Sequence, residues 1–101
     1  MKLYANSNQY GSKNKARVFK AMRALGYNLW HTSYTNGPYV FSNYTHFPGT
    51  TTSFLSLSEI EEFLNDVIEN GPGSEYSYEE QDYLPELIES ILTGSYRDDI
   101  V

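Results

Sequence analysis

The spacing of hydrophobic residues in the first quarter of the chain predicts a helix from Lys13 to about Leu25. Its apolar positions fall on one side at intervals of three and four residues and are Val18, Met22 and Leu25. Ser12 is predicted to cap the start of the helix, because its hydroxyl can accept a hydrogen bond from an unpaired backbone N–H group. Gly26 is predicted to end the helix in the left-handed conformation that glycine tolerates.

Two aromatic, β-prone segments flank the dipeptide Asn36-Gly37 and predict a hairpin. The first segment covers residues 27–35 and the second covers residues 39–47. Both turn residues accept positive φ angles, which makes Asn-Gly the strongest short-range hairpin signal. Tyr39 and Phe41 are two residues apart, so we expect their side chains on one face of the second strand.

The helix with the clearest signals is predicted to begin at Ser56. Ser56 and Glu59 fit a capping box, and Leu55 and Ile60 fit the hydrophobic staple that accompanies such a box. A second box, beginning at Ser58, also fits the pattern, but the staple favours the first. The predicted buried stripe consists of Ile60, Leu64, Val67 and Ile68, with Phe63 at its edge. The run Asn70-Gly71-Pro72-Gly73 should end the helix.

A third helix is predicted near residues 84–93, after a polar and acidic segment at residues 74–82. Pro85 would lie in its first turn, where the missing N–H group costs no hydrogen bond. Gly94 is predicted to end this helix.

These elements predict one α+β domain over residues 1–101. Short strands are also expected at residues 2–6 and 50–55, which gives the order β-α-β-β-(β)-α-α. The natural arrangement is a small antiparallel sheet built on the hairpin, with two to three helices packed on one face. Residues 95–101 are predicted to form a frayed tail.

Composition narrows the possible chemistry. The chain has 101 residues and no cysteine, which excludes disulfides and thiolate metal sites, and it has two histidines. We therefore expect no metal site and no cofactor. The sequence lacks an apolar stretch long enough for a membrane span or a secretory signal, so the expected location is the cytoplasm, with no membrane partner.

The charges are separated along the chain. The six basic residues before residue 24 give the first part +6, and the remainder carries −12, for an overall charge of −6. Four acids spaced by three, four and three residues line one helical face: Glu59, Glu62, Asp66 and Glu69. With Glu79, Glu80 and Asp82, they are predicted to bind a partner by imitating a nucleic-acid backbone. The alternative is a face that only contacts solvent.

Tyrosine is the second compositional bias, with ten residues in the chain. Tyrosine offers a large contact area and a hydroxyl at low entropic cost, which suits protein recognition. Tyr76, Tyr78 and Tyr83 flank the acidic segment and are predicted to contact the partner. The alternative is that such residues fill the core or a strand face.

The leading hypothesis is a small acidic binding protein that occupies the surface of a nucleic-acid-handling protein. In composition the chain resembles the inhibitors that phages and mobile elements make against host defence or host polymerase. The expected partner is a protein with a basic groove, and the opposite charges of the two halves also allow self-association, head-to-tail or symmetric.

Two other functions remain open. The first is a nucleic-acid-binding module that uses a basic helix face with aromatic neighbours, namely Lys13, Arg17, Lys20 and Tyr34. Tyr10, Tyr27 and Trp30 would add stacking surfaces. The second, with less support, is a small enzyme that uses Glu59 with Glu62, or Glu79 and Glu80 with Asp82, as acid and base. We expect no enzyme, because no motif in the sequence identifies a reaction.

Overall fold

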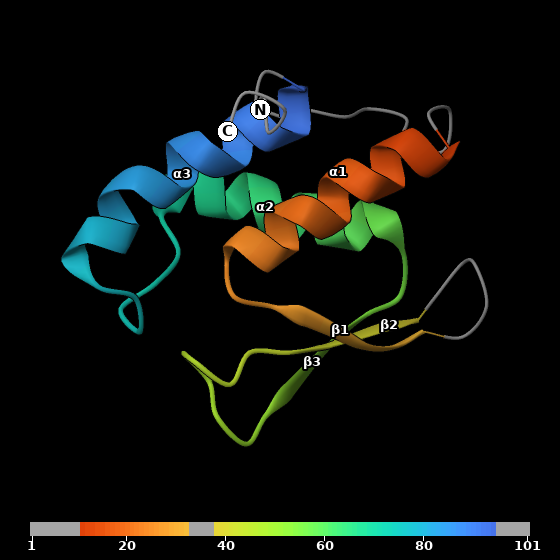
Figure 1. The fold of residues 1–101 in the computed structure, drawn as a ribbon, viewed down its shortest axis with the longest axis horizontal. Coiled ribbons are helices and arrows are strands. Elements are labelled where there is room, and N and C mark those ends of the chain that lie inside the picture. The colour runs from red at the N-terminus through yellow and green to blue at the C-terminus, as the bar shows by residue number, and fades with distance from the viewer. Residues whose placement is uncertain (1–10, 33–37, 95–101) are drawn as a thin grey trace.

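The computed structural model describes residues 11–32 and 38–94, which form three helices and a three-stranded antiparallel sheet (Figure 1). In chain order the elements are α1 (Gly11–Ala24), β1 (Asn28–Thr32), β2 (Tyr39–Ser42), β3 (Thr51–Phe54), α2 (Leu57–Asn70) and α3 (Tyr78–Thr93). The predicted α+β fold class is therefore confirmed. The strand predicted at residues 2–6, the Asn36-Gly37 turn and the tail from residue 95 lie outside the described residues.

The sheet is a meander in which β2 is the central strand. Leu29 pairs with Phe41 and Thr32 with Tyr39, with an irregularity between Leu29 and His31. On the other side Tyr39 pairs with Phe54. Tyr39, Phe41 and Phe54 are buried, as expected for side chains on one face of the pleat. The predicted pairing of the two hairpin strands is confirmed.

Strand β2 ends at Ser42, five residues before the predicted end of the strand. Its extension is blocked because the chain turns at Asn43, whose carbonyl accepts a hydrogen bond from Phe47 N at 2.8 Å. The Asn43 side chain is buried within the fold. The third strand, predicted at residues 50–55, is present as β3.

All three helices lie on the same side of the sheet (Figure 1). Helices α1 and α2 contact the sheet, and α3 packs against both of them. The core between the layers contains Val18 and Met22 from α1, Ile60 and Leu64 from α2, and Ile88 from α3. Within the described residues, no helix is long and apolar enough to cross a membrane.

Helix α1 ends in a Schellman motif at Gly26, as predicted. Gly26 N donates to Arg23 O at 2.9 Å, and Tyr27 N donates to Met22 O at 3.0 Å. The φ angle of Gly26 is 96°, a value that favours glycine. The helix begins at Gly11, one residue before the predicted cap Ser12, whose side chain lies outside the described part of the chain.

Helix α2 confirms Ser56 as its cap, since the hydroxyl of Ser56 accepts a hydrogen bond from Glu59 N at 3.3 Å. The predicted staple is absent. Leu55 is 71% exposed while Ile60 is fully buried, so the two side chains do not share an apolar contact in the core. The Glu59 carboxylate accepts from Leu55 N at 2.8 Å, which fixes the entry of the chain without a staple.

Helix α3 begins six residues earlier than predicted. Ser77 and Glu80 form a complete capping box, in which each side chain accepts a hydrogen bond from the backbone N–H group of the other residue. Residues 78–82 are therefore helical, and Pro85 lies inside the helix instead of in its first turn. Gly94 ends the helix in the left-handed conformation, as predicted.

Candidate functional site

The acidic row predicted on α2 is exposed along its whole length. Its four members lie opposite the buried side of the helix and are Glu59, Glu62, Asp66 and Glu69. At about 1.5 Å rise per residue, successive carboxylates are displaced by about 4.5 or about 6 Å along the axis. The α2 sequence contains no Lys or Arg to offset these charges.

Glu59 and Asp66 of the α2 row make local hydrogen bonds. Glu59 accepts from Leu55 N, as described above, and Asp66 Oδ1 accepts from Asn70 Nδ2 at 2.7 Å. These contacts orient two carboxylates and leave them exposed. The row is therefore partly ordered before any partner binds.

A second acidic row lies on α3, where the sequence prediction placed Glu79 and Asp82 ahead of the helix. Because the helix starts at Tyr78, four exposed acids share one face at the same spacing of three, four and three residues: Glu79, Asp82, Glu86 and Glu89. The signal that reveals this row is the Ser77–Glu80 capping box, which moves the helix start ahead of residue 79. Like α2, α3 contains no Lys or Arg.

Two of the three predicted tyrosines accompany the α3 row. Tyr78 is 92% exposed and Tyr83 is 50% exposed. On a helix, Tyr78 lies beside Asp82 and Tyr83 beside Glu79 and Glu86, at intervals of three and four residues. The outer face of α3 thus combines carboxylates with two accessible aromatic rings. We call this set the α3 surface: Tyr78, Glu79, Asp82, Tyr83, Glu86 and Glu89.

The third predicted tyrosine, Tyr76, is not part of this surface. It is only 5% exposed, and its hydroxyl donates to Leu25 O at 2.6 Å and accepts from Asn43 Nδ2 at 3.2 Å. The His46 ring stacks on the Tyr76 ring with 3.7 Å between centroids. Burial raises the pKa of Tyr76, so its hydroxyl stays protonated and keeps its role as a donor. Tyr76 holds the end of α1 against the start of α3.

Glu80, which was also predicted to contact the partner, makes its contacts within the protein. Its carboxylate accepts from Ser77 N at 2.9 Å and lies 3.3 Å from His46 Nε2. The backbone N–H of Ser77 has the largest effect and, with His46, holds the pKa of Glu80 below its ordinary value. Glu80 therefore caps a helix and ties it to the β2–β3 connection.

The basic face proposed for nucleic-acid binding is directed largely at α3. Arg17 is half-buried, and a Cβ atom added at Gly94 would lie 2.7 Å from its guanidinium. A cation at the C-terminal end of a helix is stabilised by the helix dipole. The Lys13 side chain and Tyr34 lie outside the described residues. Of the aromatic residues predicted to stack on bases, Tyr27 is buried and Trp30 is 68% exposed.

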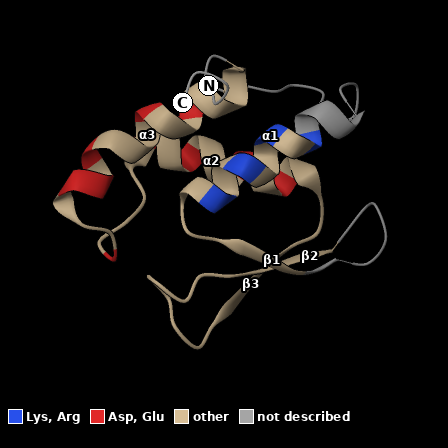
Figure 2. Cartoon of the chain, in the orientation of Figure 1, with Lys and Arg blue, Asp and Glu red and all other residues tan. Residues whose placement is uncertain are grey.

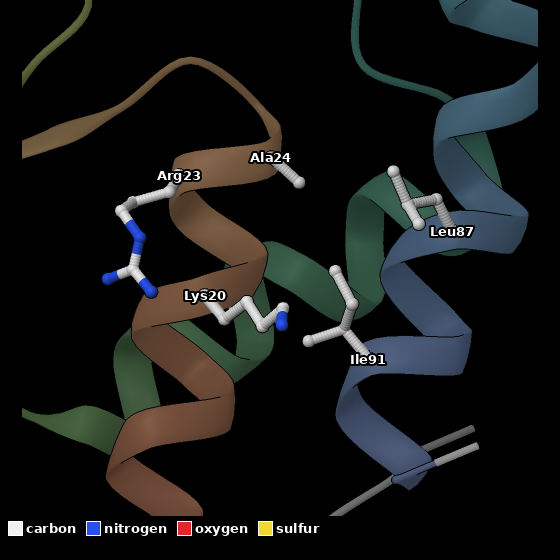
Figure 3. Close-up of a pocket in the computed structure, with 5 residues that line it drawn as sticks. All are labelled: Lys20, Arg23, Ala24, Leu87 and Ile91. Carbon is white, nitrogen blue, oxygen red and sulfur yellow. The ribbon is translucent and has the colours of Figure 1, made fainter. Parts of the chain in front are cut away.

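A shallow groove of about 280 Å³ separates α1 from α3. Its lining combines two cations with an apolar floor and consists of Lys20, Arg23, Ala24, Leu87 and Ile91 (Figure 3). Lys20 extends from α1 toward Ile91, whereas the Arg23 guanidinium points away from α3 (Figure 3).

Within the described ranges, no group of three or more His, Asp or Glu side chains lies close enough together to hold a metal ion. Comparison of the chain with models of known protein families, with curated proteins and with solved structures finds no match in any of the three. The geometry of the protein's surfaces is therefore the basis for a proposed function. The largest feature of that geometry is the pair of matching acidic rows on α2 and α3.

Proposed function

We propose that this protein binds another protein through the acidic rows on α2 and α3, and that its target has a basic, nucleic-acid-binding groove. The observation that carries the proposal is the α3 surface, where four exposed carboxylates and two exposed tyrosines share one helical face. Such a surface provides both long-range attraction and specific contacts.

The carboxylates favour a basic target. Regular negative charges at intervals of about 4.5–6 Å present to a cationic groove a field similar to that of a nucleic-acid strand, which also carries closely spaced charges. An ordinary solvent-facing helix mixes both signs, because opposite charges three or four residues apart stabilise it. On α2 and α3 that stabilisation is absent.

The tyrosines favour a specific target. Charges at the rim of an interface mainly raise the rate of association, whereas buried aromatic rings contribute most of the affinity. Tyr78 is almost fully exposed in the free protein, which is the expected state of a ring that becomes buried when a partner binds.

The test is a pull-down from bacterial lysate with the tagged protein, with and without nuclease, followed by a competition assay. We expect a protein to persist after nuclease treatment, and we expect its binding to labelled duplex DNA or RNA to be inhibited by this protein. Two double variants change equivalent positions of the two rows: Asp82→Lys/Glu86→Lys on α3 and Glu62→Lys/Asp66→Lys on α2. A control, Thr51→Lys/Ser53→Lys, adds lysines at exposed positions of β3, away from both rows.

The row variants separate the possible outcomes. Loss of capture with either row variant, and retained capture with the β3 control, supports the proposal. If both row variants still capture the target, the rows are only solvent-facing. If nucleic acid is captured and every protein partner disappears with nuclease, the protein is instead a nucleic-acid-binding module that uses Lys13, Arg17 and Lys20.

A further inference from the structure

Helices α1 and α3 lie side by side and run in opposite directions. Arg17 lies next to Gly94 at one end of the pair, and Ala24 and Leu87 line the same groove toward the other end. Within the described ranges, every Lys and Arg belongs to α1. Figure 2 shows the result as a basic helix beside an acidic one on one face of the molecule.

The strip between the two helices is apolar. Ala24, Leu87 and Ile91 form the floor of the groove, with Lys20 on its α1 side. On the α3 side Glu86 precedes Leu87 and is exposed. Across this face, the surface therefore changes from cations to aliphatic side chains to carboxylates.

We propose that this α1/α3 face binds the same face of a second copy of the chain, in a symmetric dimer. A rotation of 180° about an axis parallel to the groove, in the plane of the interface, places α1 of one copy over α3 of the other. Lys20 and Arg23 of each copy then lie over the end of the other copy's α3 that carries Glu86 and Glu89. This contact of opposite charges occurs twice in the dimer, and the two apolar strips meet at the centre. An isologous contact of this kind closes as a dimer.

The arrangement of charge favours a second copy over an unrelated partner. A partner with one sign of charge would match one half of the face and be repelled by the other half, whereas a rotated copy matches both halves. An apolar centre with a charged rim is also the usual anatomy of a protein interface. The axial positions agree as well, because Lys20, Arg23 and Ala24 line the groove together with Leu87 and Ile91, which is the level of α3 at which Glu86 and Glu89 lie.

The inference goes beyond the proposed function and does not rest on it. In the dimer the part of the α3 surface that contains Glu86 and Glu89 is covered, whereas the α2 row stays accessible. If both proposals hold, the dimer is a resting form from which a basic target must displace one copy. Because the overall charge is −6, the two copies repel at long range, and the dimer depends on local attraction that salt screens.

The test measures mass in solution by sedimentation at low salt and at about 0.5 M salt, where charges are screened within a few ångströms. Two variants of the full chain are compared with the wild type: Lys20→Glu/Arg23→Glu reverses the two cations beside the groove on α1, and Glu86→Lys/Glu89→Lys reverses the two acids at the same level of α3. The Glu62→Lys/Asp66→Lys variant on α2 is the matched control. All changes lie at half-buried or exposed positions, and circular dichroism checks that each variant is folded.

We expect the wild type and the α2 control to have the mass of two chains at low salt and the mass of one chain at high salt. Each α1 or α3 variant alone should have the mass of one chain. An equimolar mixture of these two variants should regain the mass of two chains, because each reversed stripe then faces its opposite.

Three results would overturn the proposal: a wild type that is monomeric at low salt, a dimer that persists in both variants, or folded variants whose mixture stays monomeric. None of these results affects the test of the proposed function. The Lys20→Glu/Arg23→Glu variant keeps both acidic rows, so its capture of a target is measured independently of its mass.

Discussion

At the scale of single residues, neighbouring acids in α3 have different roles that their charge does not reveal. Glu79 is exposed in the row, whereas Glu80 turns back to the backbone of Ser77 and to His46. The capping box explains the difference, because the residue three positions after the cap is the one that can reach the cap's N–H group. An acid in this position stabilises the fold by capping the helix.

This role gives Glu80 a testable pH dependence. Its pKa is lowered in the folded protein, chiefly by the Ser77 N–H group and also by His46. A lowered folded-state pKa means that the carboxylate stabilises the fold above its unfolded pKa, near pH 4, and that the stabilisation is lost as the pH falls through the folded value. We therefore expect Glu80→Gln to lower the free energy of unfolding at pH 7.

Urea unfolding of the wild type and Glu80→Gln, measured from pH 7 to pH 3, checks this expectation. The difference between the two proteins should shrink as the pH falls below about 4, because the wild-type carboxylate then becomes protonated as well. A difference of equal size at pH 7 and pH 3 would show that the substitution acts through shape or packing and not through the charge.

At the scale of elements, the features of the helices that depend on neighbouring residues were the most predictable from the sequence. The Ser56 cap and the ends at Gly26 and Gly94 depend on residues within one or two turns, and the structure confirms them. Of the predicted apolar stripe of α2, Ile60, Leu64 and Val67 are buried and Ile68 is half-buried. The start of α3 was missed although its capping box is also local. The polar and acidic composition of residues 74–82 is typical of a loop and hides the box.

The site was only partly predictable, because burial depends on contacts distant in sequence. Tyr76 resembles Tyr78 and Tyr83 in its surroundings along the chain, yet it is buried through a bond to Leu25 O, 51 residues away. Asn43 is likewise fixed by Leu25 and Tyr76. Periodicity predicts which face of a helix is polar, but it does not predict which loop residue fills a space between helices.

The proline in α3 provides an element-scale prediction. Pro85 is the eighth residue of the helix, so it cannot donate to the carbonyl of Gln81, and its ring crowds that carbonyl. Proline in a helix interior costs about 3 kcal/mol relative to alanine, and part of this cost is relieved where the helix bends. We expect Pro85→Ala to raise the free energy of unfolding by about 1–3 kcal/mol.

Denaturant unfolding of Pro85→Ala measures this gain, with Ser90→Ala on the same helix as a control for the general helix propensity of alanine. A loss of stability in Pro85→Ala, with Ser90→Ala unaffected, would mean that the proline ring contributes more through packing than it costs through the helix backbone.

At the scale of the whole molecule, the charges of the described residues are separated by element. The acids of α2 and α3 repel their neighbours in each row, while the cations of the described part are confined to α1. Like charges three or four residues apart on a helix are each destabilising by about 0.2–0.5 kcal/mol. A fold that needed these acids only for solubility would gain stability by mixing the signs, so the arrangement itself supports a role in binding.

The trade-off between stability and binding can be measured directly in the α3 row. The variant Asp82→Asn/Glu86→Gln keeps the shapes of both side chains and removes three repulsive pairs. The pairs are Glu79 with Asp82, Asp82 with Glu86, and Glu86 with Glu89. We expect a gain of about 0.6–1.5 kcal/mol in the free energy of unfolding at low salt, measured at protein concentrations that keep the chain monomeric. The same variant should capture less of the target protein.

Salt separates the electrostatic cause from other effects of the substitution. The gain should shrink at about 0.5 M salt, because the repulsion in the wild type is then screened. Glu75→Gln, an exposed acid in the loop before α3, serves as the control and should leave both stability and capture nearly unchanged. If Asp82→Asn/Glu86→Gln gains stability and still captures the target fully, the acids of α3 are dispensable for recognition. The target must then bind the α2 row.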